Sequence, residues 1–185
     1  MSTIFDTATK RASAPPEAGI PGFSEKYQEY FPRVFAFIYS RVGQTHLAED
    51  LAADVFERAY RNLDSLRNDA AFTTWLFTIA RNVIISSGRK RGRETIVDPD
   101  VIRDLAPSEA SVETQVLREE ELKDLSAVVR TFPQREQDII SLKFDAELPN
   151  AEIAAIMGIS EPNVRVIMFR TLRKLRDIMA AQRAR

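Results

Sequence analysis

Residues 150–165 read Asn-Ala-Glu-Ile-Ala-Ala-Ile-Met-Gly-Ile-Ser-Glu-Pro-Asn-Val-Arg, and this stretch predicts a helix-turn-helix. A short helix would bury Ile153, Ala154 and Ile156 and would be followed by a sharp turn and a second helix. The signals for the helix ends and the turn are a cap, a turn glycine, an apolar plug, a second cap and an early proline. In chain order they are Asn150, Gly158, Ile159, Ser160 and Pro162.

The second helix of this motif has one apolar face and one basic face. The residues predicted to pack inward are Val164, Ile167, Leu172 and Leu175. Those predicted to stay at the surface are Asn163, Arg165, Val166, Phe169, Arg170, Arg173, Lys174 and Arg176. Such a helix fits the DNA major groove, with its first turns at base edges and its later cations at phosphates. A helical hairpin that happens to contain a Gly turn is the alternative, and the basic face favours DNA binding.

Two further helices are predicted upstream within residues 112–185. An apolar stripe runs from Val112 to Phe132, where Pro133 ends the segment, and a helix follows from Gln134 to about Phe144. The segment is therefore predicted to be a four-helix domain.

Residues 23–91 predict a second, separate helical domain with three helices. Its first helix has apolar residues at three- and four-residue steps and ends at Gly43, and Thr45 would cap the next. The predicted apolar residues of the three helices are Tyr27, Tyr30, Phe31, Val34, Phe35, Ile38 and Val42, then Leu47, Leu51, Val55, Phe56 and Ala59, then Phe72, Trp75, Leu76, Ile79, Ala80, Val83 and Ile84.

The middle helix of this domain carries an acidic cluster near its start. The cluster includes Glu49, Asp50, Asp54 and Glu57. It has two interpretations: it complements the helix dipole, or it is a docking surface for a basic partner.

The third helix combines aromatic residues with a basic end, a combination suited to single-stranded DNA because bases stack and cations hold phosphates. Arg81 and the run Arg89, Lys90 and Arg91 supply the charge. Trp75 is either a stacking platform or, at its helical spacing with Phe72, a core residue.

The net charge of −1 over 185 residues conceals an uneven distribution. Residues 23–91 carry +2, residues 92–122 carry −6 and residues 123–185 carry +3. Two basic modules joined by an acidic, Pro-containing connector are typical of a protein that meets nucleic acid at two places, although each basic run alone is also compatible with a solvated helix face.

Cysteine is absent and His46 is the single histidine, which excludes disulfides, thiolate zinc sites and multi-histidine metal sites. No apolar run approaches the ~20 residues that cross a bilayer, and the first 22 residues lack a signal-peptide core, so a cytoplasmic protein is expected. No cofactor is implied, and no set of nucleophile, base and orienting group predicts an enzyme.

Three blocks together resemble the extracytoplasmic-function group of the sigma-70 family. They are Ala48–Tyr60 (AEDLAADVFERAY), Phe72–Asn82 (FTTWLFTIARN) and the helix-turn-helix, in the family's order over about Tyr27 to Met179. The resemblance implies an all-α protein with two small helical domains and an acidic flexible linker. The implied parts are a tail at 1–22, a region-2-like domain at 23–91, the linker at 92–111 and a region-4-like domain at 112–185.

The resemblance also implies partners and roles for named residues. Core RNA polymerase would be bound through its beta-prime clamp helices and its beta subunit, promoter DNA would be recognised, and an anti-sigma factor would regulate the protein. The implied polymerase-binding residues are Glu49, Asp50, Asp54 and Glu57, and the implied minus-10 residues are Trp75, Arg81, Asn82, Arg89, Lys90 and Arg91. The implied minus-35 residues are Asn163, Arg165, Val166, Phe169, Arg170, Arg173 and Lys174, with Val166 standing where many members have Ser.

Two other functions remain as alternatives. A sigma-like decoy would sequester an anti-sigma factor without engaging DNA, but it predicts the loss of DNA contacts such as Asn82 and Arg165, which are present. A free-standing helix-turn-helix repressor commonly needs a dimerisation element, and none is evident.

Overall fold

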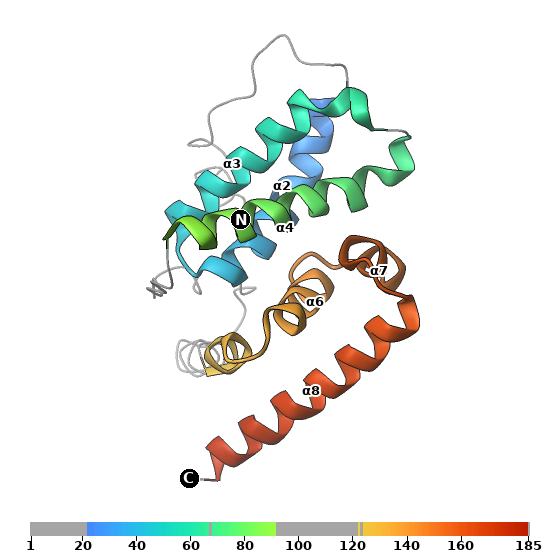
Figure 1. Ribbon diagram of the computed structural model, residues 1–185. Coiled ribbons are helices and arrows are strands. Elements are labelled where there is room, and N and C mark those ends of the chain that lie inside the picture. The colour runs from blue at the N-terminus through green and yellow to red at the C-terminus, as the bar shows by residue number, and fades with distance from the viewer. Residues whose placement is uncertain (1–21, 67, 92–121, 123, 185) are drawn as a thin grey trace, which may run out of the picture.

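The computed structural model describes residues 22–66, 68–91, 122 and 124–184, and for 90 and 91 only the backbone. In this part of the chain every regular element is a helix, as the all-α prediction required. The elements are α2 (Phe23–Val42), α3 (Thr45–Arg61), the 3-10 turns η1 (Leu63–Ser65) and η2 (Asp69–Ala71), α4 (Phe72–Arg91), α6 (Gln134–Phe144), α7 (Asn150–Met157) and α8 (Glu161–Arg183), with residues 124–130 also helical. Figure 1 shows α2, α3 and α4 above α6, α7 and α8.

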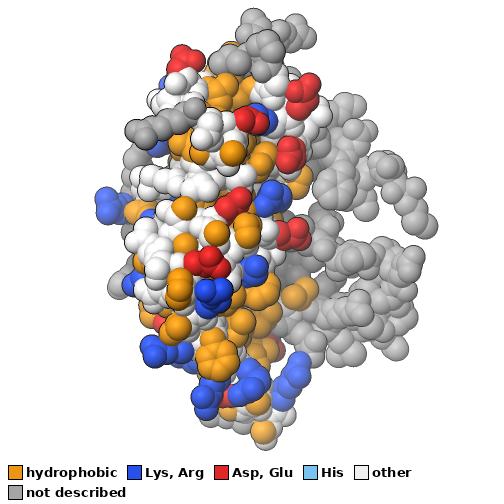
Figure 2. Space-filling view, turned by 90° about the vertical axis from the view of Figure 1, so that its right-hand side faces the viewer, with side chains coloured by type: hydrophobic (Ala, Val, Ile, Leu, Met, Phe, Trp, Pro, Cys, Tyr) orange, Lys and Arg blue, Asp and Glu red, His pale blue; other side chains and the backbone are white. Residues whose placement is uncertain are grey.

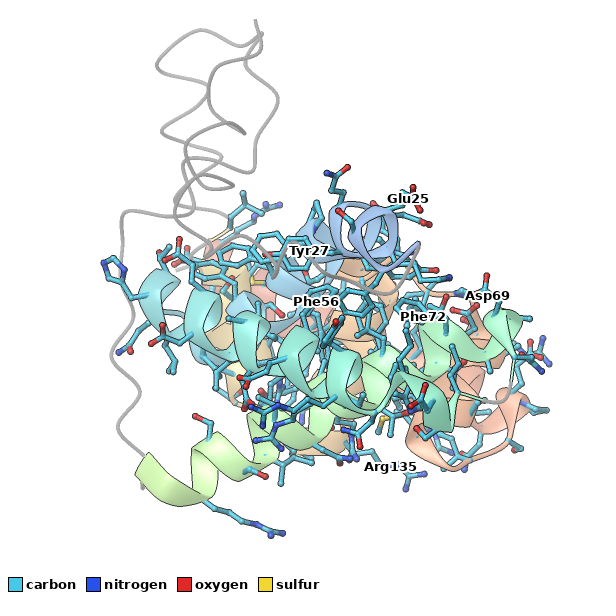
Figure 3. All side chains as sticks on the ribbon, turned by 90° about the horizontal axis from the view of Figure 1, so that it is seen from above. Glu25, Tyr27, Phe56, Asp69, Phe72 and Arg135 are labelled. Atoms are coloured by element: carbon cyan, nitrogen blue, oxygen red, sulfur yellow. The ribbon has the colours of Figure 1, made fainter. Side chains whose placement is uncertain are left out.

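The first domain, α2 to α4, is built around aromatic side chains. Tyr27 on α2 points toward Phe56 on α3 (Figure 3), with ring centroids 4.7 Å apart and edge-on geometry. Phe37 on α2 meets Phe77 on α4 in the same way at 5.8 Å, and both are fully buried. Aromatic pairs of this kind add about 0.5–1.5 kcal/mol beyond their buried area, so the three helices form a firmly packed unit.

The second domain, from 124–130 to α8, has a smaller core of its own. Val128, Phe132 and Ile140 are buried together, and side chains from the C-terminal half of α8 pack against them. The prediction of a helix from Gln134 to about Phe144 is confirmed. The preceding helix ends at residue 130, three residues before the predicted end at Pro133, and Pro133 is the N-cap of α6.

The two domains pack against each other. Ile139, Leu142 and Ile153 of the second domain belong to the same apolar cluster as the core of α2 to α4. Polar contacts join the same surfaces: the Ser40 and Ser141 hydroxyl oxygens lie 3.0 Å apart. The sequence did not predict how the two domains are arranged. In the structure they are in direct contact.

Gly43 ends α2 as predicted, with φ at 68° in the left-handed region that favours glycine. The guanidinium of Arg130, from the second domain, lies so close that any side chain at position 43 would displace it. A cation beside the C-terminus of a helix is also favoured by the helix dipole.

Some details of the first domain differ from the predictions. Gln44 is the N-cap of α3 and Thr45 is its first residue, so the predicted Thr45 cap was wrong. The buried stripe of α3 runs through Ala48 and Ala52, while Leu47 and Leu51 are only half-buried. Small residues lie at the centre because α2 and α4 both pack closely against α3.

Several predictions lie outside the described residues. They concern the tail before residue 22, the acidic linker at 92–111 and the helical segment at 112–121.

Candidate nucleic-acid interfaces

The helix-turn-helix has the turn that the sequence predicts. Gly158 ends α7 in the left-handed conformation, with φ at 65°. The Ile159 N–H donates to the Ala154 carbonyl at 3.0 Å, which completes the C-terminal cap of α7. Ile159 itself packs half-buried against the core, as the predicted plug should.

Of the two predicted caps of the motif, Asn150 is misplaced, while Ser160 is in the predicted position but makes no side-chain bond. Asn150 is the first residue of α7 rather than its cap, which is Pro149, and the Asn150 Oδ1 atom is buried without a hydrogen bond in the described structure. Ser160 does occupy the N-cap position of α8, but its side chain makes no capping bond. The turn glycine and the apolar contacts therefore define the motif more than the caps do.

The side of α8 that carries the predicted minus-35 residues, called the recognition face below, is exposed and combines basic with apolar side chains. Val166 is 46% exposed and Phe169 69% exposed, although both are large and apolar. The remaining predicted minus-35 residues are also exposed; they are Asn163, Arg165, Arg170, Arg173 and Lys174. Figure 2 shows blue cationic side chains around orange apolar ones in the lower half of the molecule.

The opposite side of α8 explains why these residues point outward. Val164 and Thr171 are buried, and the Thr171 hydroxyl donates to the Ile167 carbonyl at 2.9 Å. Thr171 was not among the residues predicted to pack inward, because a hydroxyl is not part of an apolar pattern. A threonine at a buried helical position can satisfy its hydroxyl by donating to the backbone carbonyl four residues earlier.

Individual cations on α8 are held in different ways. Arg165 pairs with Glu161 one turn earlier at 3.2 Å, an exposed contact that DNA can replace. Lys174 lies over the ring of Phe132 at 4.6 Å. Arg170, Arg173 and Lys174 share a shallow surface depression toward the end of the helix. The arrangement allows early residues to read base edges and later ones to contact phosphates.

The predicted minus-10 residues on α4 are not equally available. Asn82 and Arg89 are exposed, and the side chains of Lys90 and Arg91 are outside the described structure. Trp75 is half-buried, with its ring 5.9 Å from that of Phe72, so it is partly a core residue. The same helix also buries Phe77 fully, which the apolar pattern missed.

Arg81 is held by the second domain. Its Nε donates to Asp138 Oδ2 at 2.9 Å, and Asp138 Oδ1 accepts a bond from Gln134 at 3.0 Å. Arg41 on α2 completes the group, with Nη2 3.3 Å from Asp138 Oδ1 and Nη1 donating to Gln137 at 2.6 Å. Burial lowers the pKa of Arg41, while Asp138 acts in the opposite direction. The described structure thus places one predicted DNA-binding cation in an ion pair between domains.

Sequence reasoning missed this cluster, although a signal was present. Gln134, Asp138, Ser141 and Asp145 fall at steps of three and four residues, which gives α6 a polar stripe. Burial raises the pKa of Asp145, and hydrogen bonds from Ser40 and Ser141 work against that shift. A polar stripe normally predicts a solvent-facing side, and here it faces the other domain.

The acidic residues of α3 lie on an outer face and are largely paired within the helix. Arg58 donates two bonds to Asp54, at 2.7 and 2.9 Å, and Arg61 pairs with Glu57. His46 lies 3.6 Å from Glu49. Asp50 is exposed and has no ion-pair partner among the described residues. The face can accept a basic partner through exchange of these weak surface pairs.

Other kinds of site find no support in the described residues. These residues contain no group of three or more His, Asp or Glu placed to hold a metal ion. Within the same part of the chain, no helix has both the length and the apolar character to span a membrane.

Comparison with known proteins finds two family matches. Residues 27–94 match Sigma-70 region 2, and residues 129–177 match Sigma-70, region 4. The ECF RNA polymerase sigma factor SigM of Bacillus subtilis is 32% identical over 154 residues, covering 83% of this chain and 93% of SigM. SigW of the same organism is 31% identical, covering 84% of this chain and 90% of SigW.

Two solved structures share the fold. CnrH, determined in complex with the cytosolic domain of CnrY, has a TM-score of 0.66 at 20% identity and covers 94% of this chain and 95% of its own. RpoE of Bartonella quintana, determined with the anti-sigma factor NepR, has a TM-score of 0.66 at 23% identity and covers 87% of this chain and 98% of its own.

Proposed function

The chain belongs to the ECF sigma factors of the sigma-70 family, and on this premise we propose that it reads a minus-35 element with α8 and captures the minus-10 strand with α4. The observation that carries the proposal is the exposed face of α8, where Arg165, Val166 and Phe169 project from a helix-turn-helix. Core polymerase performs the chemistry, and this chain supplies recognition and strand capture. We place it in the cytoplasm, where its polymerase and DNA partners are found.

Val166 and Phe169 give the α8 face an apolar character that supports contact with thymine methyl groups. Arg165, next to Val166, can donate two hydrogen bonds to a guanine edge. The minus-35 element is therefore proposed to combine methyl-bearing bases with at least one guanine.

Run-off transcription tests the function directly. Core polymerase is incubated with a library of promoter sequences, with and without this chain, and transcripts that require the chain are sequenced. The proposed function requires specific transcripts that share two elements at a fixed spacing. Absence of such transcripts, together with tight binding of a regulatory protein, would support the decoy alternative instead.

Polymerase docking is assigned to the outer face of α3. The double substitution Asp50→Lys and Asp54→Lys should weaken association with core polymerase at least tenfold, because it replaces attraction by repulsion on that face. The matched control is Glu25→Lys with Glu29→Lys, which makes the same change of charge at exposed positions of α2. Equal effects from both pairs would argue against a docking role for α3.

An anti-sigma factor is the proposed regulator. RpoE, which shares this fold, was solved with the anti-sigma factor NepR, and CnrH was solved with the cytosolic domain of CnrY. An anti-sigma factor bound to the exposed apolar and basic face of α8 would cover the residues that are proposed to contact DNA. Competition between promoter DNA and the regulator for this chain would test the assignment.

A further inference from the structure

The contact between the domains is centred on a buried carboxylate. Asp138 is 1% exposed and accepts bonds from Arg81, Arg41 and Gln134, so both of its oxygens are satisfied. Arg41, on the opposite domain, is 4% exposed. A buried ion pair between two domains is sensitive to the loss of either partner, because the remaining charge would be left without compensation.

Two anionic partners compete for the Arg81 guanidinium. Under the proposed function it contacts a phosphate of the minus-10 strand, and in the structure it contacts Asp138 at 2.9 Å. A carboxylate and a phosphate both present oxygen acceptors that bind guanidinium through charge-assisted hydrogen bonds. Asp138 therefore occupies Arg81 in the way that a DNA phosphate would.

The dimensions of a promoter require the domains to separate. Elements at minus-10 and minus-35 lie about 25 base pairs apart, or roughly 85 Å at about 3.4 Å per pair. A compact chain of 185 residues has a radius of gyration of about 16 Å and is about 40 Å across. The 30 residues from 92 to 121 reach about 100 Å when extended, so the chain between the domains is long enough to permit separation.

We propose that Asp138 is an internal latch that holds the protein closed by occupying Arg81 and Arg41 until a partner separates the domains. The inference rests on the proposed function, because it assumes that α4 and α8 bind DNA. In the closed state α8 is exposed, while Arg81 is bonded to Asp138. When this bond breaks, Arg81 becomes available to DNA and the second domain can move away from the first.

Other contacts between the two domains add to the free energy that is needed to separate them. Ile139 and Leu142 are buried in the core shared by the two domains, and Arg33 donates to the Ala146 carbonyl at 2.9 Å. Separation exposes this apolar area and leaves several bonds unmade. Binding energy from core polymerase must drive the opening, so the free protein stays closed.

An engineered cross-link tests whether closure blocks function. The Ser40 and Ser141 oxygens are 3.0 Å apart across the contact, and the chain has no cysteine, so Ser40→Cys with Ser141→Cys can form one defined disulfide. The oxidised double variant should lose at least tenfold of its run-off transcription, and reduction should restore it. The single variants, treated with the same oxidant, are the controls.

The outcomes separate the latch from the proposed function. If the reduced variant and the unmodified protein both fail to support transcription, the proposed function is wrong. If the disulfide forms and the oxidised protein transcribes fully, or if no disulfide forms in the free protein, the latch is wrong.

A second variant isolates Asp138 itself. Asp138→Asn keeps the shape but removes the charge, and it should strengthen binding of a single-stranded minus-10 oligonucleotide by the free protein about tenfold. Asp124→Asn makes the same change at an exposed position of the same domain and should alter binding less than twofold. Fluorescence energy transfer between labels on α3 and α8 should show a larger separation for Asp138→Asn only. Equal binding by both variants, or an unchanged separation, would overturn the role of Asp138.

Discussion

Helices α4 and α8 carry similar residue types and use them differently. On α4 the aromatic side chains Phe72 and Phe77 are buried, and on α8 Phe169 is 69% exposed. The difference follows from the neighbours: α4 is packed by α2, α3 and α7, whereas one side of α8 faces solvent. An aromatic and basic helix is therefore a core element or a binding surface according to how many of its faces are covered.

The arginines of the two helices show the same contrast. Arg81 on α4 is bound to a carboxylate of the other domain, which is itself buried. Among the described residues, Arg165 on α8 pairs with Glu161, a glutamate of its own helix. Under the proposed function, the α8 surface can meet DNA in the structure as it stands, whereas Arg81 of α4 must first be released from Asp138.

The largest expected effect distinguishes the two aromatic roles. Phe77→Ala should lower the free energy of unfolding by about 3–5 kcal/mol, because it removes a fully buried ring and leaves a cavity. Phe169→Ala should change it by no more than about 0.5 kcal/mol but should weaken minus-35 binding. Urea denaturation and a DNA-binding assay measure both. A large loss of stability from Phe169→Ala would remove the contrast.

Base reading by α8 is the next largest effect. Arg165→Ala should cost about 1–3 kcal/mol of DNA-binding free energy and relax selectivity at one minus-35 position. Binding to a set of single-base variants of the promoter measures this. Leu122, exposed and away from α8 in sequence, can be replaced by Ala as a control that should leave selectivity unchanged.

A phosphate contact should behave differently from a base contact. Arg173→Ala should weaken binding about equally for all sequences and should reduce the slope of log K against log salt by about 0.9, the value for one phosphate. Titrations at several salt concentrations measure the slope. If Arg165→Ala and Arg173→Ala have the same effect, α8 does not divide its residues between bases and phosphates.

The smallest effect concerns pH and the surface between the domains. Because burial raises the pKa of Asp145, its proton stabilises the folded state, and that contribution is lost as pH rises through the raised pKa. Asp145→Asn has no such proton. The variant should therefore gain stability relative to the unmodified protein as pH rises through that range, as measured by unfolding at several pH values. A difference that does not vary with pH would contradict the shift.

Much of the local structure could be predicted from spacing alone. The end of α2 at Gly43, the bounds of α6 and the outward direction of Val166 and Phe169 all follow from local patterns and are confirmed. Periodicity works here because a helix places residues three and four apart on one face. The caps Thr45 and Asn150 were predicted one residue too late, since helix ends depend on small differences in backbone energy.

The candidate site residues also fall into those whose exposure follows from one helix and those whose exposure depends on neighbouring helices. The acidic face of α3 and the recognition face of α8 are local surfaces, so their place at the surface could be predicted, while their roles toward polymerase and DNA stay predictions. Trp75 proved half-buried, and its spacing with Phe72 was compatible with either role. A single helix does not reveal which of its faces another helix covers.

By itself the sequence determined that this protein is helical, that it carries a helix-turn-helix and that its charges lie in two basic modules around an acidic connector. Only the tertiary structure decided that Arg81, Arg41 and Asp138 meet, although Arg41 and Asp138 are 97 residues apart. Local patterns are set by the geometry of one helix. The pairing of charges across domains is set by which surfaces pack together, and burial then makes each charge depend on its partner.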